Sequence, residues 1–420
     1  MDEFSGVLAG VSVLDFSRAV AGPFCTMLLG DYGADVVKVE RPGVGDDTRQ
    51  WGPPFVDGES AYFLALNRNK RSLAVDLQTE AGRALVRALA ERADVVVENF
   101  RPGTMERLGL GYTTLAARNP RLVYCSISGY GRTGPRRDQA GYDVMVSGLG
   151  GLLSITGYPD GPPAKVGVPV LDMATGLAAH GAICAALYAR ERTGRGRRVD
   201  LSLFATQIAL LLNAASNYLL CGEVMGRWGT AHPSIVPYQG FAARDGYFLI
   251  GAANDRLFRR LCAVLGHPEW ADDPRFATNG DRVRHREVLL PAIEAITRER
   301  TVAEWLAALE AAGIPAAPIN TVDRALEDPQ VAALGLVRTV AHPTLGPIRL
   351  TAPFVQFDGE APAIRRPPPR LGEHTAAVLE EWLGLDAATI AQLRAAGVVA
   401  EPAPEARPSL PAAPPPQPDR

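Results

Sequence analysis

Short apolar strands alternate with helical patterns from residue 11 to about residue 128, and this alternation limits the possible folds more than any other feature. The strand-like segments are 11–16, 35–40, 94–98 and 121–127, and the helical segments include 24–32 and a helix with Ala81, Leu85 and Leu89 on one face. Such an order is typical of a parallel sheet covered by helices, so we predict an α/β fold with a Rossmann-like large domain. No GxGxxG follows the first strand, which argues against a dinucleotide-binding dehydrogenase.

The 420 residues exceed one ordinary core and are enough for about two or three domains. We predict that 1–225 begins the large domain, 226–330 forms a smaller α+β domain, and 331–400 returns to complete the large domain. Residues 401–420, rich in Pro and Ala, are predicted to be a disordered tail.

Several elements of the middle and the end of the chain can be predicted in more detail. Residues 201–220 indicate one buried helix rather than a membrane span, because Gln207, Asn213, Ser216 and Asn217 interrupt the apolar run. The other predicted helices are 174–191, 254–265, 283–298, 302–312, 374–384 and 386–395, and the other predicted strands are 247–250, 347–351 and 354–357.

Charge and cysteine usage exclude several classes of protein. The net charge is only -3, from 43 basic and 46 acidic residues, so nucleic acid is not an expected partner. The five cysteines are far apart and odd in number, as in reduced cytosolic proteins. No secretory signal and no membrane span is visible, so we predict a cytoplasmic location without a membrane partner. The six histidines show no ligand spacing, and no metal is expected.

Asp172 is the strongest candidate for a catalytic residue. It lies between the apolar stretch with Val166, Val168 and Val170 and the small-residue helix start at Ala174. This pattern predicts a strand-to-helix corner, where open α/β folds place their active sites. The alternative is that Asp172 is a helix N-cap whose carboxylate binds the first free amides.

Polar segments follow the predicted strands. Glu40–Gly43 follows the second strand, Glu98–Gly103 the third and Ser128–Gly131 the fourth. Because strand ends in doubly wound sheets converge on one crevice, Arg41, Asn99, Arg101 and Arg107 are expected to lie around one site. Clustered arginines suit a phosphate-bearing ligand, although each arginine alone could be a solvated surface residue.

Ordered motifs now give the chain a family resemblance. They are Val13-Leu14-Asp15-Phe16 with Ala21-Gly22-Pro23, Leu29 to Glu40, Asn69-Lys70-Arg71-Ser72, Val97 to Gly103, Gly141-Tyr142-Asp143 and Thr193-Gly194-Arg195-Gly196. From about residue 6 to 399 the chain resembles the class III CoA-transferases, the family of the formyl-CoA and carnitine CoA-transferases.

The resemblance implies roles for particular residues. It makes Asp172 the nucleophile and coenzyme A, as acyl-CoA, the substrate. It also implies an interlocked homodimer. The CoA contacts that it implies are Val20, Ala21, Arg41, Val75, Asp76, Leu77, Gln78, Asn99, Phe100, Arg101, Arg107, Ala140, Gly141, Tyr142 and Asp143.

The expected chemistry is acyl transfer through an aspartyl anhydride and an aspartyl-CoA thioester, with oxyanions held by backbone amides at the Asp172 corner or in a glycine-rich loop. The main alternative is an α-methylacyl-CoA racemase, which resembles the same fold but needs a base on each face of the substrate. Racemases carry Gly-His-Asp where this chain has Gly141-Tyr142-Asp143, which favours a transferase. A further alternative is a CoA-ester-binding paralogue without turnover, which the presence of Asp172 disfavours.

Within the family, the segment Arg227–Gln239, Pro318-Ile319-Asn320 and Arg366–Pro369 resemble the succinyl-CoA–glutarate CoA-transferase branch. The chain lacks the run of consecutive glycines of formyl-CoA transferase, so oxalate is doubtful as the acceptor. We therefore expect succinyl-CoA as the donor and a dicarboxylate such as glutarate as the acceptor. Arg18, Arg227 and His232 are candidates for holding the second carboxylate, although each could also have only a structural or solvated role.

Overall fold

The computed structural model describes residues 6–402, which form two compact units. Within that range, unit 1 contains residues 6–128, 176–201 and 339–402, and unit 2 contains 129–175 and 202–338. This division differs from the boundaries expected at 226 and 330, because 129–175 and 202–225 group with the small domain rather than with the sheet. The predicted tail lies, from residue 403 onward, outside the described residues.

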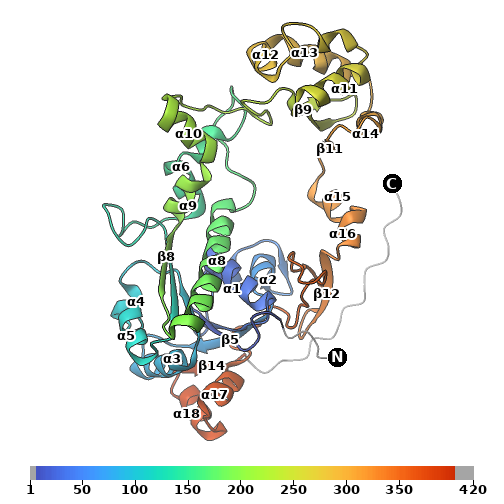
Figure 1. Cartoon of the computed structure of the whole chain (residues 1–420). Helices are drawn as coiled ribbons and strands as arrows, with labels where there is room; N and C mark the ends of the chain where they lie inside the picture. Colours follow the sequence, from blue (N-terminus) through green and yellow to red (C-terminus); the bar gives the residue numbers. More distant parts are fainter. Residues whose placement is uncertain (1–5, 403–420) are drawn as a thin grey trace. The chain divides into compact units, whose positions relative to one another are not determined.

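A seven-stranded sheet forms the centre of unit 1 (Figure 1). In spatial order its strands are β14 (Val399–Ala400), β5 (Lys70–Val75), β2 (Asp35–Glu40), β1 (Ser12–Asp15), β6 (Val95–Glu98), β7 (Val123–Ser128) and β8 (Arg198–Ser202). The pairs from β5 to β7 are parallel, and β14 is antiparallel to β5. The prediction of an α/β fold with a parallel sheet is therefore confirmed.

The order of the strands determines where a ligand can bind. From β1 the chain builds outward through β2 and β5 on one side, and then through β6 and β7 on the other. Val13 consequently pairs with Val36 of β2 and with Val95 of β6. In such sheets a crevice opens at the carboxyl ends of the two neighbouring strands from which the chain builds outward in opposite directions. Here that switch point lies between β1 and β6.

Helices and the C-terminal segment complete unit 1. The helices are α1 (Ala21–Asp31), α2 (Ala61–Leu66), α3 (Glu80–Arg92), α4 (Thr104–Arg107), α5 (Tyr112–Arg118), α17 (Thr375–Leu383), α18 (Ala387–Ala395) and most of α8 (Val170–Thr193). Leu89 of α3 and Val378 of α17 are fully buried in one core with Leu14, Val37 and Val96 of the strands. Each such side chain stabilises the fold by about 1.5–3 kcal/mol.

Gly176 allows α8 to pack closely on the start of α1. A Cβ atom at this position would lie 2.7 Å from the carbonyl oxygen of Ala21. Helix α8 also has the length and apolar composition of a membrane-crossing helix. Its residues Ala179 and Ile183 are fully buried, as is typical of the core helix of a folded domain.

Two strands were expected at 347–351 and 354–357, and the second prediction is wrong. β13 (Gly346–Thr351) pairs with β12 (Val337–His342), but Phe357 makes only an isolated bridge with Glu360. Asp358 and Gly359 between them have φ values of 53° and 85°. Two consecutive positive φ values form a tight reversal, so the chain turns back before a strand can extend.

The core of unit 2 lies within a three-stranded sheet and the helices packed on it. The strands, in order, are β11 (Ala316–Pro318), β10 (Tyr247–Gly251) and β9 (Tyr238–Ala242). Between β10 and β11 the chain forms the helices α11 (Asp255–Leu265), α12 (Asn279–Arg284), α13 (Arg286–Thr297) and α14 (Val302–Ala311). Phe248, Phe258 and Trp305 are buried in this core, and the Trp305 indole donates to the Thr297 carbonyl at 2.7 Å.

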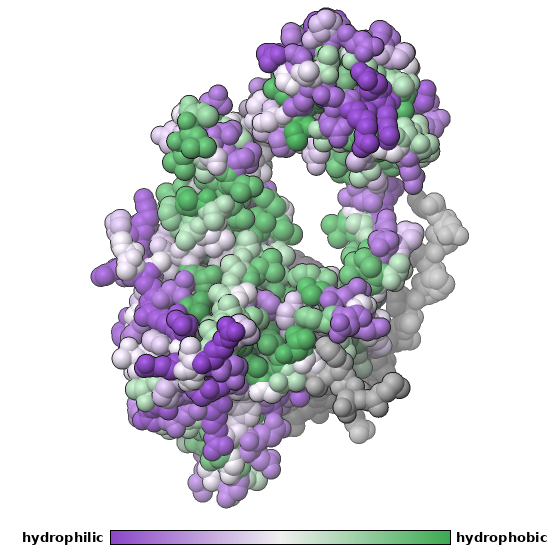
Figure 2. All heavy atoms as spheres, in the orientation of Figure 1, coloured by the Kyte–Doolittle hydropathy of each residue, from purple (hydrophilic) through white to green (hydrophobic). Residues whose placement is uncertain are grey.

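Unit 2 also contains α6 (Asp143–Leu149), α7 (Leu152–Ile155), α9 (Leu203–Leu210), α10 (Leu212–Cys221), α15 (Val322–Leu326) and α16 (Pro329–Ala333). The prediction of one buried helix at 201–220 is wrong, because α9 and α10 meet at a bend of 71°. Helix α10 contains no buried residue, and Leu212 and Leu219 are 75% and 77% exposed. An apolar run predicts burial, but nothing within the described chain covers this surface, which is coloured as hydrophobic in Figure 2.

Candidate functional site

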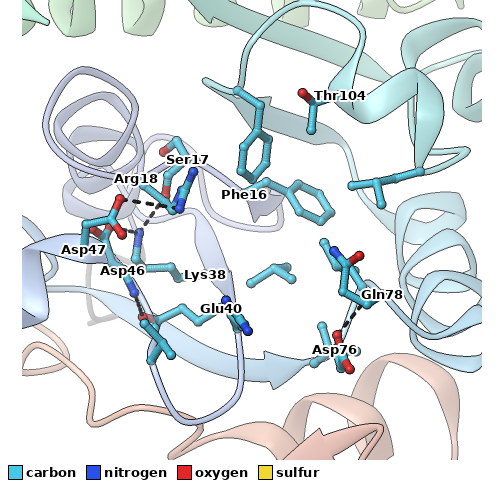
Figure 3. A pocket seen from close by; sticks show the side chains of 18 residues that line it. Phe16, Ser17, Arg18, Lys38, Glu40, Asp46, Asp47, Asp76, Gln78 and Thr104 are labelled. Atoms are coloured by element: carbon cyan, nitrogen blue, oxygen red, sulfur yellow. Dashed lines mark hydrogen bonds and ion pairs between the residues drawn. The ribbon is translucent and has the colours of Figure 1, made fainter. Parts of the chain in front are cut away.

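A cavity of about 530 Å³ opens at the carboxyl ends of the unit 1 strands (Figure 3). Its walls come from the segments that follow β1, β2, β5 and β6. The lining residues are Phe16, Ser17, Arg18, Lys38, Val39, Glu40, Arg41, Val44, Gly45, Asp46, Asp47, Val75, Asp76, Leu77, Gln78, Phe100, Thr104 and Leu108. The cavity therefore lies at the switch point of the sheet, where ligands of doubly wound folds bind.

Buried polar groups fix the loop after β1 that forms one edge of this cavity. Asp15 accepts from the Ser17 amide at 2.9 Å, and the Lys38 ammonium donates to the Ser17 carbonyl at 2.8 Å. The side-chain amide of Asn99 binds both the N–H and the C=O of Arg18, at 2.8 and 2.7 Å. These bonds hold Ala19 at a φ of 64°, a conformation that is costly for a residue other than glycine.

Two fully buried lysines lie beneath the same loop. Lys38 is 2.7 Å from Asp46, and Lys70 is 3.2 Å from Asp15. Burial acts to raise the pKa of Asp46, but the Lys38 ammonium outweighs it and holds that pKa at about 2. Burial lowers the pKa of Lys70 to about 8, although Asp15 partly opposes this effect. The paired charges of Lys38 and Asp46 thus line the cavity, whereas Lys70 and Asp15 are not among its lining residues.

The predicted arginines differ in their surroundings. Arg18 lies 3.4 Å from Asp47 and stacks over the Phe100 ring, and Arg107 donates to Thr104. Arg41 is an exposed residue of the cavity wall, and Arg101 is also exposed. Within the described part of the chain, neither Arg41 nor Arg101 has a carboxylate partner. Two unpaired guanidinium groups beside a cavity suit an anionic ligand.

The structure brings together most, but not all, of the unit 1 residues that the resemblance implied. Arg41, the segment 75–78 and Phe100 line the cavity, and so does Arg18. Val20 and Ala21 are buried at the start of α1, and Asn99 is hydrogen-bonded to the backbone of Arg18 in the loop after β1. Arg101 and Arg107 do not line the cavity themselves but flank its lining residues Phe100, Thr104 and Leu108.

Asp172 belongs to unit 2 and lies in the first turn of α8, which begins at Val170. The expected strand-to-helix corner is wrong in one respect, because the segment before Val170 is irregular rather than a strand. Its prolines and glycines, such as Gly167 and Pro169, lower its tendency to form a strand. Asp172 is half-buried, and its carboxyl accepts no hydrogen bond from the described residues.

The capping residue of α8 is Asp143, not Asp172. One carboxylate oxygen of Asp143 accepts from the amides of Leu171 and Asp172, at 2.9 and 3.1 Å. Those two amides, which were candidate oxyanion donors, are therefore already used. Burial raises the pKa of Asp172 to about 7, and the neighbouring Asp143 carboxylate adds to the rise. The alternative role of Asp172 as a helix N-cap is therefore wrong, because the amides that it would bind are bound to Asp143.

The Ala140–Asp143 segment is placed by two glycines. A Cβ at Gly129 would lie 3.0 Å from the Cα of Gly141, so the loop after β7 and this segment can approach only without side chains. Tyr142, in the position of the racemase histidine, is 64% exposed and is the N-cap residue of α6.

Arg227 and His232 have other partners in unit 2. Arg227 donates to the carbonyls of Tyr158, Pro159 and Gly161 at 2.7–3.0 Å. The Nδ1 atom of His232 accepts from the Ser234 amide at 3.0 Å. Neither side chain has an interaction with Asp143 or Asp172 in the described structure. Both side chains stabilise loops, and this makes them weaker candidates for holding a substrate carboxylate.

Sequence reasoning missed the buried charges Lys38, Asp46 and Lys70 and the capping role of Asp143. Lys38 gave a weak signal as a charge inside an apolar strand, but its partner Asp46 is identifiable only in the folded chain. Residues 6–402 contain no group of three or more His, Cys, Asp or Glu side chains placed to hold a metal.

Comparison with known proteins is consistent with this geometry. Residues 8–375 match CoA-transferase family III, and the chain belongs to this family. The predicted family membership and CoA-transferase activity are therefore confirmed. Among curated relatives, the succinyl-CoA:glutarate CoA-transferase of Mus musculus is 47% identical over 93% of this chain and 90% of its own length. The succinate–glutarate CoA-transferase of Agrobacterium fabrum is 45% identical over 89% of this chain and 95% of its own length.

Solved structures agree on the fold. A CAIB/BAIF family protein from Brucella suis superposes with a TM-score of 0.80 at 44% identity. The match covers 90% of this chain and 99% of that protein.

Proposed function

We propose that the protein transfers CoA from succinyl-CoA to a dicarboxylic acid, with glutarate as the first candidate. The observation that carries the proposal is the half-buried carboxyl of Asp172, which has no hydrogen-bond partner among the described residues and is free to attack. The identity of the two acids is supported by the names of the relatives from Mus musculus and Agrobacterium fabrum.

The proposed reaction has four balanced steps. An oxygen of Asp172 attacks the thioester carbon of succinyl-CoA, and the C–S bond breaks to give a mixed anhydride and CoA thiolate. The thiolate attacks the aspartyl carbonyl and releases succinate, which leaves an aspartyl-CoA thioester. A carboxylate of glutarate then attacks this thioester and expels the thiolate. Attack of the thiolate on the glutaryl carbonyl gives glutaryl-CoA and restores the Asp172 carboxylate.

The unit 1 cavity is the proposed binding site for the nucleotide part of CoA. Arg41, Arg101 and Arg107 would hold phosphates, because guanidinium groups form paired bonds with phosphate oxygens. Residues 75–78, at the carboxyl end of β5, would contact the adenosine. The hydrogen bonds that hold the loop after β1 order this site before the ligand binds, which reduces the entropy lost on binding.

We also propose a cytoplasmic, interlocked homodimer. The support for the dimer is the apolar surface of α10, where Leu212, Tyr218, Leu219 and Leu220 are between 60% and 83% exposed. Contiguous exposed apolar surface of this kind marks interaction sites. Light scattering should give a particle of twice the chain mass at all accessible concentrations. A monomer would refute the assembly but not the activity.

The activity is tested by incubating the protein with succinyl-CoA and a panel of free acids and following new CoA esters by mass. Glutaryl-CoA is the expected main product. Incubation with a 2-methylacyl-CoA in deuterium oxide tests the racemase alternative. Deuterium at the α-carbon without CoA exchange between acids would refute the proposal and support a racemase.

The pH dependence of the first step should report the ionisation of Asp172. Only the carboxylate is a nucleophile, so kcat/KM for succinyl-CoA should rise with pH to a plateau, with a midpoint near the pKa of about 7. In Asp143→Asn the like charge is removed while the amide oxygen can still cap α8, so the midpoint should move to lower pH. Asp160→Asn, at an exposed position of unit 2, is the matched control and should not shift it. A midpoint unchanged in Asp143→Asn would contradict the coupling.

A further inference from the structure

Arg286 in unit 2 is a buried cation without a buried counter-charge. It is 8% exposed and is the first residue of α13. Four other arginines of the described chain are buried, and each has a carboxylate partner: Arg68 with Asp31, Arg71 with Asp35, Arg190 with Asp94 and Arg282 with Asp255. Arg286 has none within the described residues. A buried charge is normally paired, so this exception needs an explanation.

The contacts of Arg286 leave part of its guanidinium group free. Its Nη2 donates to the Pro233 carbonyl, and its Nε makes a long bond of 3.4 Å to the Val283 carbonyl. Its Nη1 donates to none of the described residues. The guanidinium carbon lies 4.5 Å from the centre of the Trp228 ring system, close enough for a cation–π contact. A planar guanidinium held in this way presents unused N–H groups in a fixed direction.

Arg286 and Trp228 line a cavity of about 610 Å³ between α13 and the β9–β10 strands. The size is within the range of sites for small molecules, about 300–1,000 Å³. Tyr158 and Tyr247 add aromatic surface to the walls, and Glu287 and Glu294 add negative charge. Glu294 is already paired with Arg298 at 2.6 Å, whereas Glu287 is exposed. Because Glu294 is paired, mainly Glu287 repels an anion beside Arg286, and this repulsion grows with the number of negative charges, so a small acid is favoured over the nucleotide part of CoA.

We propose that this cavity binds a short aliphatic dicarboxylic acid, with one carboxylate on the free edge of Arg286 and the methylene chain against Trp228. The naming of the acid as glutarate rests on the proposed function. A carboxylate supplies the missing counter-charge and accepts the unused N–H groups of the guanidinium. The second carboxylate stays outside this contact. Arg286 is thus a specificity-determining residue for the acceptor acid.

Calorimetric titration of the full chain with glutarate, in the absence of any CoA ester, tests the site directly. We expect saturable binding to the wild-type protein and none of 1,5-pentanediol, which has the same chain length without charge. Arg286→Met, which keeps the stem but removes the charge, should weaken glutarate binding by roughly 10- to 100-fold. Arg284→Met, at an exposed position two residues earlier where the guanidinium is already paired with Asp281, is the matched control and should bind as the wild type does.

A second variant keeps the test decisive if Arg286→Met does not fold. Glu287→Gln, at an exposed position, removes a negative charge from the rim and should tighten glutarate binding by about 2- to 5-fold. Unchanged binding in both Arg286→Met and Glu287→Gln overturns the proposal. So does equal binding of 1,5-pentanediol and glutarate.

Transfer kinetics test whether this site binds the acceptor acid, and their outcome can be distinguished from a failure of the proposed function. In Arg286→Met the KM for glutarate should rise by at least about tenfold, whereas the KM for butyrate, whose only carboxylate reacts, should change little. A structural role alone would lower kcat for both acids equally. If the wild-type protein transfers no CoA, the proposed function fails, and the calorimetric result still decides whether Arg286 binds a dicarboxylate.

Discussion

Asp172→Asn should lower CoA transfer from succinyl-CoA to glutarate by a factor of about 10⁴ or more, because the amide cannot form the anhydride. The variant should also fail to gain the mass of CoA when it is incubated with succinyl-CoA, whereas the wild-type protein should gain it. Mass spectrometry of the intact protein gives this measurement. Asp160→Asn, an exposed aspartate of the same unit, should keep full activity.

Asp172→Asn should also be more stable than the wild-type protein at pH 8. The pKa of Asp172 is about 7 in the folded chain and 3.8 without the fold, so folding favours the neutral carboxyl. The stabilisation from this preference is complete below pH 3.8 and is lost as the pH rises through 7. Asparagine has no charge to bury, so the gain in unfolding free energy at pH 8 should be on the order of 2–4 kcal/mol. Transfer that persists in a well-folded Asp172→Asn protein would rule out the covalent route.

Asp15→Ala should destabilise unit 1 by about 3–5 kcal/mol, because it leaves the ammonium of Lys70 buried without its carboxylate. Asp15 and Lys70 are both fully buried and lie 3.2 Å apart, and Asp15 also accepts from Ser17 and Thr26. Urea denaturation, followed by circular dichroism, measures the loss. The loop after β1 should also loosen, since Asp15 holds its Ser17 amide.

Two comparisons isolate the effect of the buried charge. Glu91→Ala removes an exposed pair with Arg118 that is closer than the buried one, and should cost no more than about 1 kcal/mol. The double variant Asp15→Leu/Lys70→Met removes both charges and should recover much of the stability that Asp15→Ala loses. A cost for Asp15→Ala as small as that for Glu91→Ala would show that the pair is not required for folding.

Much of the sheet of unit 1 could be predicted from local patterns. β1, β2, β6 and β7 are short runs of Val, Leu and Ile that alternate with helices, and each lies within about two residues of its predicted position. β5 was missed as a strand, because Lys70-Arg71-Ser72 at its start is polar although every residue of the strand is buried. The partners that permit this burial, Asp15 for Lys70 and Asp35 for Arg71, are far away in the sequence.

The α9–α10 segment illustrates the opposite error. Its apolar residues predicted burial, yet Leu219 and Leu220 are exposed in the chain. Hydrophobic patterning shows that a side chain avoids water, but it does not show whether the same chain or a second copy provides the cover.

The sequence alone determined the family, the α/β class and the identity of Asp172 as the candidate nucleophile, because ordered motifs and strand–helix periodicity are local properties. Only the tertiary structure decided that Asp143 caps α8, that Lys38 and Asp46 support the loop after β1, and that Arg286 lacks a counter-charge. Each of these depends on which groups become neighbours once the chain is folded. The cost of burying a charge is set by those neighbours and not by the residue itself.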